Sequence, residues 1–432
     1  MNGEAIFCGH AVTEASHTFA EYRRRGGYSG LEKALAGMQP ADVQREVAKS
    51  NLQGRGGAGF ATGAKWGFVD KKSPVVYLCC NIDEGEPGTF KDRWILEHSP
   101  HQLIEGILLA AYALRVRHAF AYIRGEFDLP LRRLQAALQE ARDAGLVGEH
   151  ILGSNFSCEI IIHRGAGAYV CGEESSLLNS LEGKKGLPRN KPPFPAVRGL
   201  YRQPTIVNNA ETLATVPWII VNGGEKYATI GVKKSPGTRL FGVSGHVTRP
   251  GLYERPTGYP LYKLVFEDAG GILGGRALKA VIPGGSSTPV LTAAEVEIVT
   301  LAPDSMANAG SMLGSGAVIV IAEGTCMVRL LQVLTRFYAH ESCGQCTPCR
   351  EGTDWMNRIL ERILAGQGVA ADLEALRSIP AGIRGKTICA LGDAAAMPVA
   401  SFLKKFGPEF EHFIQHGRSL CDGRLAVTGA AP

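Results

Sequence analysis

The chain has 432 residues, of which 45% are hydrophobic and 20% are charged, and its formal net charge is +5. The length predicts two or three domains, and the composition is that of a globular protein. Basic and acidic residues are mixed along the chain, so the small positive excess does not indicate nucleic-acid binding. No stretch reaches the roughly 18 to 20 apolar residues of a membrane span. The first residues also lack the features of a secretory or transit signal, and we therefore expect a soluble, cytoplasmic protein.

The first half of the chain is predicted to alternate helices with strands. Polar helices are expected within 1–50, and the elements expected after them are a strand at 75–81, a helix at 101–115, a strand at 118–126, a helix at 129–145 and a strand at 158–165. Such alternation indicates a parallel sheet in an α/β domain. The stretch 182–205 is rich in proline and glycine, so we expect no regular structure there. A long ordered loop of this kind is typical of a functional segment.

The character of the sequence changes near residue 238. A hairpin around TRPG (248–251), a helix at 261–271 and a strand from 278 indicate a small β-grasp-type domain. After residue 330 the spacing of apolar residues is helical. The predicted domains are an α/β domain at 1–237, a β-grasp domain at 238–329 and a helical domain at 330–432.

Three of the 11 cysteines lie close together in HESCGQCTPCREG (340–352). An odd count with such clustering favours a metal centre over a disulfide framework. The C-x-x-C-x-x-C spacing lets three thiolates turn toward one inorganic centre, and three such thiolates with a distant fourth are a common ligand set for a [4Fe–4S] cluster. Zinc sites usually draw on two Cys or His pairs, and no second pair is seen, although His340 leaves a Cys/His zinc site open.

Cys343, Cys346 and Cys349 therefore need a fourth ligand. Cys389 precedes small residues at the start of a predicted helix, whereas Cys421 lies in a polar C-terminal stretch. We predict Cys389 as the fourth ligand. Six further cysteines lie far apart in the sequence; they are Cys8, Cys79, Cys80, Cys158, Cys171 and Cys326. We predict that most of these six are small buried hydrophobic residues.

The segment GRGGAG (54–59) satisfies the pattern G-x-G-x-x-G. Polar helical residues precede it, whereas a Rossmann fingerprint requires a buried strand there, so we reject a Rossmann site. A run of glycines still bares backbone N–H groups that can cradle a phosphate. Positive charge and flat apolar faces follow at Arg55, Lys65, Phe60, Trp66 and Phe68. The combination suits a nucleotide or a flavin, and the alternative is a surface loop with incidental aromatic residues.

Two further segments have the character of ligand-binding loops. NIDEGEPGTFKDR (81–93) follows a predicted strand end, where open α/β sheets place ligands, and its Asp83, Glu84 and Glu86 can accept hydrogen bonds from a ribose or a ring N–H. A solvated turn is the alternative. In the segment 164–183, small residues lead to Gly172, Glu173 and Glu174 at the start of an amphipathic helix.

Together these stretches resemble the NADH-oxidising flavoprotein subunit of respiratory complex I, also called the 51-kDa subunit or the F subunit. The matching stretches follow the family's order over nearly the whole chain; they are GRGGAGFATGAKW, DEGEPGTFKDR, GAGAYVCGEESSLLNSLEGKKGLPRNKPPFP, PTIVNNAET and ESCGQCTPCREG. The resemblance implies an FMN-binding α/β domain that is not a standard Rossmann fold. It also implies a ubiquitin-like, SLBB-like β-grasp domain and a C-terminal helical bundle that carries the cluster.

The resemblance also implies the cofactors and their ligands. The [4Fe–4S] cluster would be held by Cys343, Cys346, Cys349 and Cys389. FMN would be held without a covalent bond by Gly54, Arg55, Gly56, Lys65, Asn81, Asp83, Glu84, Gly172, Glu173, Glu174, Asn208, Asn209 and Thr212. The substrate NADH would stack on the flavin at Phe60, Lys65, Phe68, Glu86, Glu174, Lys191 and Phe194.

The function implied is that of the electron-input subunit of NADH:quinone oxidoreductase, on the cytoplasmic side of the inner membrane and without a membrane span of its own. A hydride passes from NADH to FMN, and electrons then pass singly to the cluster. No side chain is needed as a general acid or base, and Glu86 and Lys65 are expected to tune the reaction. The implied partners are a small [2Fe–2S] thioredoxin-like subunit and a large multi-cluster iron–sulfur subunit.

Two alternatives remain from the sequence. The same module occurs as the diaphorase subunit of NAD-dependent hydrogenases and formate dehydrogenases, which often carry additional fused thioredoxin-like or ferredoxin domains that we do not find here. A zinc-stabilised binding scaffold is the alternative from a different class of protein. Visible absorption distinguishes the two classes, because flavin and iron–sulfur centres are coloured and zinc is not.

Overall fold

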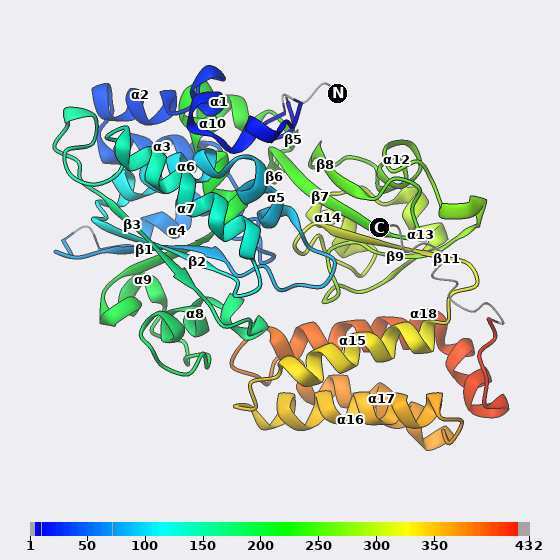
Figure 1. Ribbon diagram of the computed structural model, residues 1–432. Helices are drawn as coiled ribbons and strands as arrows, with labels where there is room; N and C mark the ends of the chain where they lie inside the picture. The colour runs from blue at the N-terminus through cyan, green and yellow to red at the C-terminus, as the bar shows by residue number, and fades with distance from the viewer. Residues whose placement is uncertain (1–4, 10, 71, 422–432) are drawn as a thin grey trace. The chain divides into compact units, whose positions relative to one another are not determined.

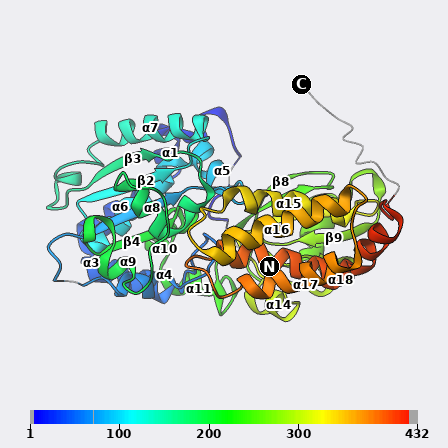
Figure 2. The same cartoon turned by 90° about the horizontal axis from the view of Figure 1, so that it is seen from below.

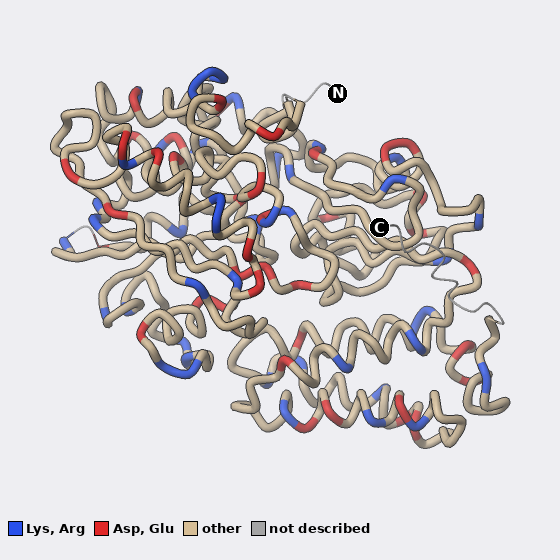
Figure 3. The backbone as a smooth tube through the Cα atoms, in the orientation of Figure 1, with Lys and Arg blue, Asp and Glu red and all other residues tan. Residues whose placement is uncertain are grey.

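A computed structural model describes residues 5–9, 11–70 and 72–421. The chain divides into two compact units (Figure 1). The first unit lies within Met1–Gly85, Thr89–Gly242 and Leu252–Tyr259, and the second lies within Glu86–Gly88, Val243–Gly251 and Pro260–Pro432. Lys and Arg are interspersed with Asp and Glu along the chain in both units (Figure 3). The predicted division into three domains is not tested by this grouping and stays a prediction.

A four-stranded sheet forms the centre of the first unit. Its strands are β1 (Tyr77–Ile82), β2 (His118–Ile123), β3 (Glu159–Arg164) and β4 (Thr205–Asn209). They lie in the order β3-β2-β1-β4, and every neighbouring pair is parallel. The predicted parallel sheet and its first three strands are confirmed, whereas β4 was not predicted.

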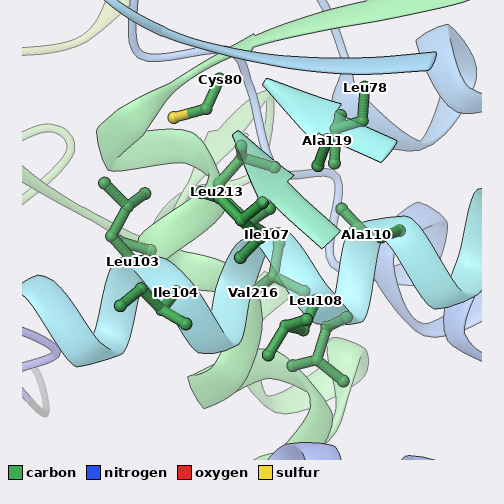
Figure 4. Close-up of a cluster of buried hydrophobic side chains, with 14 of the residues drawn as sticks. Leu78, Cys80, Leu103, Ile104, Ile107, Leu108, Ala110, Ala119, Leu213 and Val216 are labelled. Atoms are coloured by element: carbon green, nitrogen blue, oxygen red, sulfur yellow. The ribbon is translucent and has the colours of Figure 1, made fainter. Parts of the chain in front are cut away.

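Two apolar helices cover one face of this sheet. They are α6 (Pro100–Leu114) and α10 (Ala210–Asn222), which pack against each other and against the strands. Figure 4 shows this core, in which the side chains of Leu103, Ile107, Leu213 and Leu78 are 0% exposed. α6 is buried along nearly its whole length and is mainly apolar, as expected for a helix that is enclosed by its neighbours. Pro100 occupies its first turn, where the missing N–H has no cost.

The remaining helices of the first unit surround this core. They are α1 (Phe19–Arg24), α2 (Ser29–Gly37), α3 (Pro40–Lys49), α4 (Thr62–Gly67), α5 (Lys91–His98), α7 (Asp128–Asp143), α8 (Glu174–Leu181), α9 (Pro195–Arg198) and α11 (Gly224–Ala228). Figure 1 shows α6 and α7 above the strands and α8 and α9 below them. The expectation that 182–205 has no regular structure is wrong at α9, because Pro195 stands at the first helical position, where proline fits without strain.

A five-stranded sheet runs through the second unit in the order β10-β9-β11-β7-β8. Its strands are β7 (Thr238–Gly245), β8 (Gly251–Pro256), β9 (Leu278–Ile282), β10 (Leu291–Thr292) and β11 (Ala317–Ala322). The division between the units passes through β7 and β8. The predicted hairpin strands and the strand from 278 are confirmed, and the predicted helix appears as α12 (Leu261–Lys263) continued by a π-helical turn over Leu264–Asp268.

The second unit also contains the short helices α13 (Ala293–Ile298) and α14 (Pro303–Asn308). Its C-terminal part consists of four longer helices, α15 (Met327–Glu341), α16 (Thr347–Leu364), α17 (Ala370–Ile383) and α18 (Leu391–His416). They pack against one another, and Figures 1 and 2 show them as a bundle. The predicted helical C-terminal region is therefore confirmed. Among the described residues, no helix combines the length and the apolar character needed to cross a membrane.

Candidate cofactor sites

The predicted flavin residues gather at one edge of the parallel sheet. Because all four strands run the same way, their carboxyl ends share that edge, which is where open α/β sheets bind ligands. The Asn81 side-chain amide donates to the carbonyl of Gly172 at 2.7 Å, and its oxygen accepts from the Asp83 N–H at 3.0 Å. A Cβ on Gly172 would lie 3.3 Å from the carbonyl oxygen of Asp83, so this close approach favours glycine. The loop after β1 is thereby joined to the segment before α8.

The glycine loop lies against the end of β4. Its base is closed by a hydrogen bond from the Gly54 N–H to the carbonyl of Phe60 at 2.8 Å. Gly57 and Gly59 have φ of +123° and +67°, a region that glycine adopts without strain. A Cβ on Gly56 would lie 3.2 Å from that of Asn209. The N–H groups of residues 56–59 donate to no described residue, and they are available to an anionic ligand.

The helix α3 precedes this loop, which confirms that the loop is not a Rossmann fingerprint.

Arg55 does not present its guanidinium to solvent. The side chain is 0% exposed, and Nη2 donates to the hydroxyl of Tyr227 at 2.9 Å and to the carbonyls of Pro236 and Thr238 at 3.0 Å each. Its backbone N–H donates to the Thr212 hydroxyl at 2.8 Å. Arg55 and Thr212 therefore fasten the glycine loop to α10 and to the segment around 236, and the part of Arg55 that adjoins the loop glycines is its backbone.

Lys65, Glu173, Glu174 and Lys191 form a chain of ion pairs beside the strand ends. Lys65 Nζ donates to Glu174 Oε2 at 2.9 Å and to the carbonyl of Val207 at 2.8 Å. Lys191 Nζ lies 2.7 Å from Glu173 Oε1 and 2.9 Å from Glu174 Oε1. Burial raises the pKa of Glu174, but Lys65 and Lys191 outweigh burial and hold that pKa below its usual value. Glu173 also accepts from the N–H groups of Ser175 and Ser176, which caps α8.

The three phenylalanines predicted to contact the nucleotide are all exposed. Phe60, Phe68 and Phe194 are 52%, 59% and 58% exposed, and the rings of Phe60 and Phe68 have centroids 6.0 Å apart. Trp66, by contrast, is buried and donates through Nε1 to the Asn208 side-chain oxygen at 2.8 Å. Trp66 therefore offers no face for stacking, and its role is to hold Asn208.

The carboxylates of Glu84 and Glu86 have different environments. Glu84 is buried and accepts from the N–H groups of Asp92 and Arg93 at 2.9 Å each, at the start of α5. Burial and then Asp92 raise the pKa of Glu84 to about 7. Glu86 belongs to the second unit, where its Oε1 accepts from the N–H of Ser287 at 2.7 Å and from the hydroxyl of Ser286 at 3.3 Å.

A buried charge cluster behind Asn209 was not predicted. Lys91 Nζ lies 2.7 Å from Asp92 Oδ1, 3.1 Å from Glu211 Oε2 and 3.1 Å from the Asn209 side-chain oxygen. Lys91, Asp92 and Glu211 are 2%, 3% and 1% exposed. Two adjacent opposite charges at the start of a helix, in FKDR, are the sequence signal that indicates such a cluster, although the same residues also fit a solvated acidic loop.

The predicted cluster cysteines lie at or near helix ends in the second unit, with Cys343 in the connection between α15 and α16 and Cys346 directly before α16. Cys349 lies in the first turn of α16, and Cys389 lies two positions before α18, as predicted. The Ile388 N–H donates to Cys346 Sγ at 3.3 Å, which brings the 388–389 segment to the motif. Burial raises the pKa of the Cys349 thiol, the hydrogen bond with the Ser342 hydroxyl acts against this shift, and Cys343 and Cys346 raise the pKa further. Within the described part of the chain, no group of three or more His, Cys, Asp or Glu side chains is arranged to hold a single metal ion.

The other cysteines are free thiols. Cys79, Cys80, Cys158, Cys171 and Cys326 are buried, in agreement with the prediction, whereas Cys8 is exposed. Cys421 lies 3.5 Å from Lys279 Nζ and 3.4 Å from the carbonyl of Thr325.

Two family models match the chain. The first is described as the Nuo51 FMN-binding domain and matches residues 47–218; the second is described as the NADH-ubiquinone oxidoreductase-F iron-sulfur binding region and matches residues 329–413. The NADH-quinone oxidoreductase F 2 subunit of Rhizobium meliloti (strain 1021) is 54% identical over 403 residues, which cover 93% of this chain and 96% of that protein. The chain belongs to the family of NADH-quinone oxidoreductase F subunits.

Other members of the family agree with this assignment. The F subunit of Mycobacterium tuberculosis (strain ATCC 25618 / H37Rv) is 50% identical over 417 residues, covering 95% of this chain and 93% of that protein. The F subunit of Rickettsia bellii (strain OSU 85-389) is 48% identical over 404 residues, covering 93% and 97%. The FMN-binding region spans every predicted flavin residue from Gly54 to Thr212, and the iron–sulfur region spans all four predicted cysteine ligands.

A solved structure also has this fold. It belongs to an NAD+-reducing [NiFe]-hydrogenase in the H2-reduced state, with a TM-score of 0.83 and 38% identity, and the match covers 94% of this F-family chain and 68% of that chain. The resemblance found in the sequence, the α/β fold class and the FMN and [4Fe–4S] cofactors are confirmed by these comparisons.

Proposed function

We propose that this protein oxidises NADH with FMN bound at the carboxyl edge of the parallel sheet and with a [4Fe–4S] cluster on Cys343, Cys346, Cys349 and Cys389. The observation that carries the proposal is the meeting of separate stretches at that edge. Asn81 joins the loop after β1 to Gly172, and Gly56 lies against Asn209 at the end of β4. Stretches at least 91 positions apart in the sequence thus meet at this edge of the sheet.

The glycine loop and the strand ends fit a flavin nucleotide. The N–H groups of residues 56–59 have no partner among the described residues and can receive a phosphate, because backbone donors in such a loop form an anion-binding concavity. Polar side chains at the strand ends can fix the ring by hydrogen bonds. When bound, FMN takes two electrons as a hydride from NADH and gives them up singly, which is the form in which an iron–sulfur cluster accepts electrons.

The exposed aromatic residues fit the nucleotide substrate. Phe60 and Phe68 lie next to each other and are more than half exposed, so a flat ring can cover them and remove apolar surface from water. Lys65 and Lys191 supply positive charge for the nucleotide phosphates. Their pairing with Glu174 keeps the site close to neutral and holds both ammonium groups in place before the substrate arrives.

The chain's own groups position the reactants and tune the electrostatics, and hydride transfer needs no general acid or base. Glu86 is held by the backbone N–H of Ser287, which fixes its carboxylate. We assign Lys65 and Glu86 as tuning residues for substrate affinity and product release.

The cysteine set fits an iron–sulfur cluster. Backbone N–H groups that donate to ligand sulfurs stabilise the anionic thiolates and influence cluster potentials. The Ile388 N–H already donates to Cys346 Sγ, directly beside Cys389.

Electrons must leave the cluster, and the chain has one C-x-x-C-x-x-C motif. We propose that a small [2Fe–2S] thioredoxin-like subunit and a large multi-cluster iron–sulfur subunit receive them, on the cytoplasmic side of the inner membrane. The relatives' names support membership of a multi-subunit NADH-quinone oxidoreductase. Affinity purification of the tagged chain from its own cells, followed by identification of the bound subunits, tests this assignment.

The composition of the purified chain tests the function. Anaerobically purified protein is expected to contain one FMN, four iron atoms and four sulfides per chain, and NADH is expected to bleach its flavin absorption. Zinc in place of iron, or an absence of flavin together with no response to NADH, would overturn the proposal.

A diaphorase subunit of an NAD-reducing hydrogenase is the second candidate, because that structure shares the fold at 38% identity. The F subunits support the first candidate more strongly, since the Rhizobium meliloti protein is 54% identical and matches over 96% of its length. The match to the hydrogenase chain covers 68% of that chain. Co-purification with a hydrogenase instead of a quinone reductase would favour the second candidate.

A further inference from the structure

The side-chain amide of Asn209 is held on three sides. Its oxygen accepts from Lys91 Nζ at 3.1 Å and from the Glu211 N–H at 3.0 Å. Its nitrogen donates to Asp92 Oδ2 at 2.6 Å. An ammonium must face the oxygen and a carboxylate must face the nitrogen, so the opposite orientation of the amide would place donor against donor and acceptor against acceptor.

Lys91 and Asp92 are buried charges that a simple core would not contain. Lys91 lies between Asp92 and Glu211, and all three are at most 3% exposed. Burial lowers the pKa of Lys91, but Asp92, Glu211 and Glu84 outweigh burial and keep the ammonium charged. Replacing a buried ion pair by apolar residues is often neutral or stabilising, so stability alone does not explain the presence of these charges.

The hydrogen bonds leave Asn209 with one unused group. A carboxamide has two N–H donors and an oxygen with two lone pairs. The oxygen already accepts twice and the nitrogen donates once within the described chain. One N–H therefore remains, on a half-buried side chain that lies against Gly56 of the glycine loop.

We propose that Lys91 and Asp92 are positioning residues of the flavin site, which hold the Asn209 amide so that its remaining N–H is offered to an acceptor atom of bound FMN. The inference rests on the proposed FMN site at this edge of the sheet. Lys91 and Asp92 do not touch the flavin in this scheme. They act through Asn209, and they also tie the start of α5 to the start of α10.

An exchange of the carboxylate and the amide tests the proposal in the full-length chain. In Asp92→Asn, an amide replaces the carboxylate that accepts the hydrogen bond from the Asn209 nitrogen. In Asn209→Asp, two carboxylates face each other. The double variant Asp92→Asn/Asn209→Asp restores complementary pairing without changing the net charge. It places at position 209 a carboxylate, which has no N–H to donate. Asp128→Asn is the control, because Asp128 is an exposed carboxylate at the start of α7 and its ion pair with the exposed Arg132 contributes little.

The measurements are the Tm of the FMN-free chain and the Kd for FMN from quenching of flavin fluorescence. Each single variant is expected to lower Tm and to weaken FMN binding by roughly 10-fold or more, in line with the loss of a buried hydrogen bond. The double variant is expected to recover Tm while FMN binding stays at least roughly 10-fold weaker. Asp128→Asn is expected to match the parent chain in both.

Three results would overturn the inference. Recovery of FMN affinity together with Tm in the double variant would show that the cluster serves only stability. Unchanged FMN affinity in both single variants would show that Asn209 does not contact the flavin, and failure of the double variant to recover Tm would show that the pairing is not as described. If the parent chain itself does not bind FMN, the proposed function fails and not this inference alone.

Discussion

The N–H of Ile388 donates a hydrogen bond to Cys346 Sγ at 3.3 Å, across 42 positions of the chain. This contact places the segment that contains Cys389 beside the cysteine motif. Cys421, by contrast, lies beside Lys279 and Thr325. The contact between Ile388 and Cys346 supports our proposal that Cys389 is the fourth ligand of the cluster. The assignment can be tested without changing the flavin site.

Cys389→Ser is expected to lose most of the iron and the broad visible absorption of the cluster while it keeps FMN. Cys421→Ser is the matched control and is expected to keep both. Iron, sulfide and flavin contents of the two anaerobically purified variants are the measurement. A Cys421→Ser protein without iron, beside a Cys389→Ser protein with a full complement, would reverse the assignment.

Phe68→Ala is expected to raise KM for NADH without changing the affinity for FMN. Stacking of aromatic rings contributes about 0.5 to 1.5 kcal/mol beyond the buried area, so the expected rise is roughly 2- to 13-fold. Steady-state kinetics with ferricyanide as acceptor give KM, and flavin content gives the control. Trp355→Ala removes another exposed aromatic residue, on α16, and is expected to leave KM unchanged. Equal effects of both variants would argue against a specific role of Phe68.

Glu86→Gln is expected to alter NADH affinity or NAD+ release while FMN stays bound. The glutamine oxygen can still accept from the Ser287 N–H, so the local fold is kept and only the charge is removed. KM for NADH, the inhibition constant of NAD+ and the flavin content are the quantities to compare. Glu225→Gln changes an exposed carboxylate and serves as the control. Loss of FMN from Glu86→Gln would contradict the role that we assign to this residue.

Glu84 makes the stability of the fold depend on pH. Its pKa rises from 4.5 to about 7 in the folded chain, mainly through burial and then through Asp92, while Lys91 and the N–H groups of Asp92 and Arg93 act in the opposite direction. The folded protein therefore binds more protons than the unfolded chain between these two values. The stabilisation of the folded state by protonated Glu84 is fully present at pH values below the pKa that Glu84 has in the unfolded chain. It is lost as pH rises through the pKa that Glu84 has in the folded chain.

Glu84→Gln is accordingly expected to flatten the decline in the free energy of unfolding between about pH 5 and pH 7. The contribution removed is of the order of 3 kcal/mol, at about 1.4 kcal/mol for each pKa unit. Denaturant titrations of both proteins at several pH values measure it. An identical pH dependence in the two proteins would show that Glu84 does not titrate in this range.

Much of the fold follows from local patterns in the sequence. The apolar runs of β1 to β3 and the spacing of α6 and α7 predicted the parallel sheet, because period and length are local properties. β4 was not predicted because it has only five residues, two of which are asparagines, a residue type that is uncommon in strands. Asn209 caps the start of α10, and Asn208 accepts a hydrogen bond from Trp66. Proline and glycine in 182–205 suggested an irregular loop, and the short α9 forms there because Pro195 is tolerated at a helix start.

Long-range contacts account for what the sequence did not predict at the site. Arg55 was expected to offer positive charge, yet its guanidinium bonds to Tyr227, 172 positions away. Trp66 was expected to offer a flat face, yet it is buried against Asn208. Lys91 and Asp92 belong to α5, and they form a cluster with Glu211, which belongs to α10. No periodicity within one segment shows which charges will meet.

The transfer of electrons from NADH through FMN to the cluster is the central claim, and low-temperature EPR of the full-length chain tests it most directly. Anaerobic protein with FMN is expected to develop the signal of a reduced [4Fe–4S] cluster when NADH is added. Protein stripped of FMN is expected to show no signal with NADH, to show it with dithionite, and to respond to NADH again after FMN is returned. A cluster signal produced by NADH in the FMN-free protein would contradict the account, as would no response to NADH in protein that contains both cofactors.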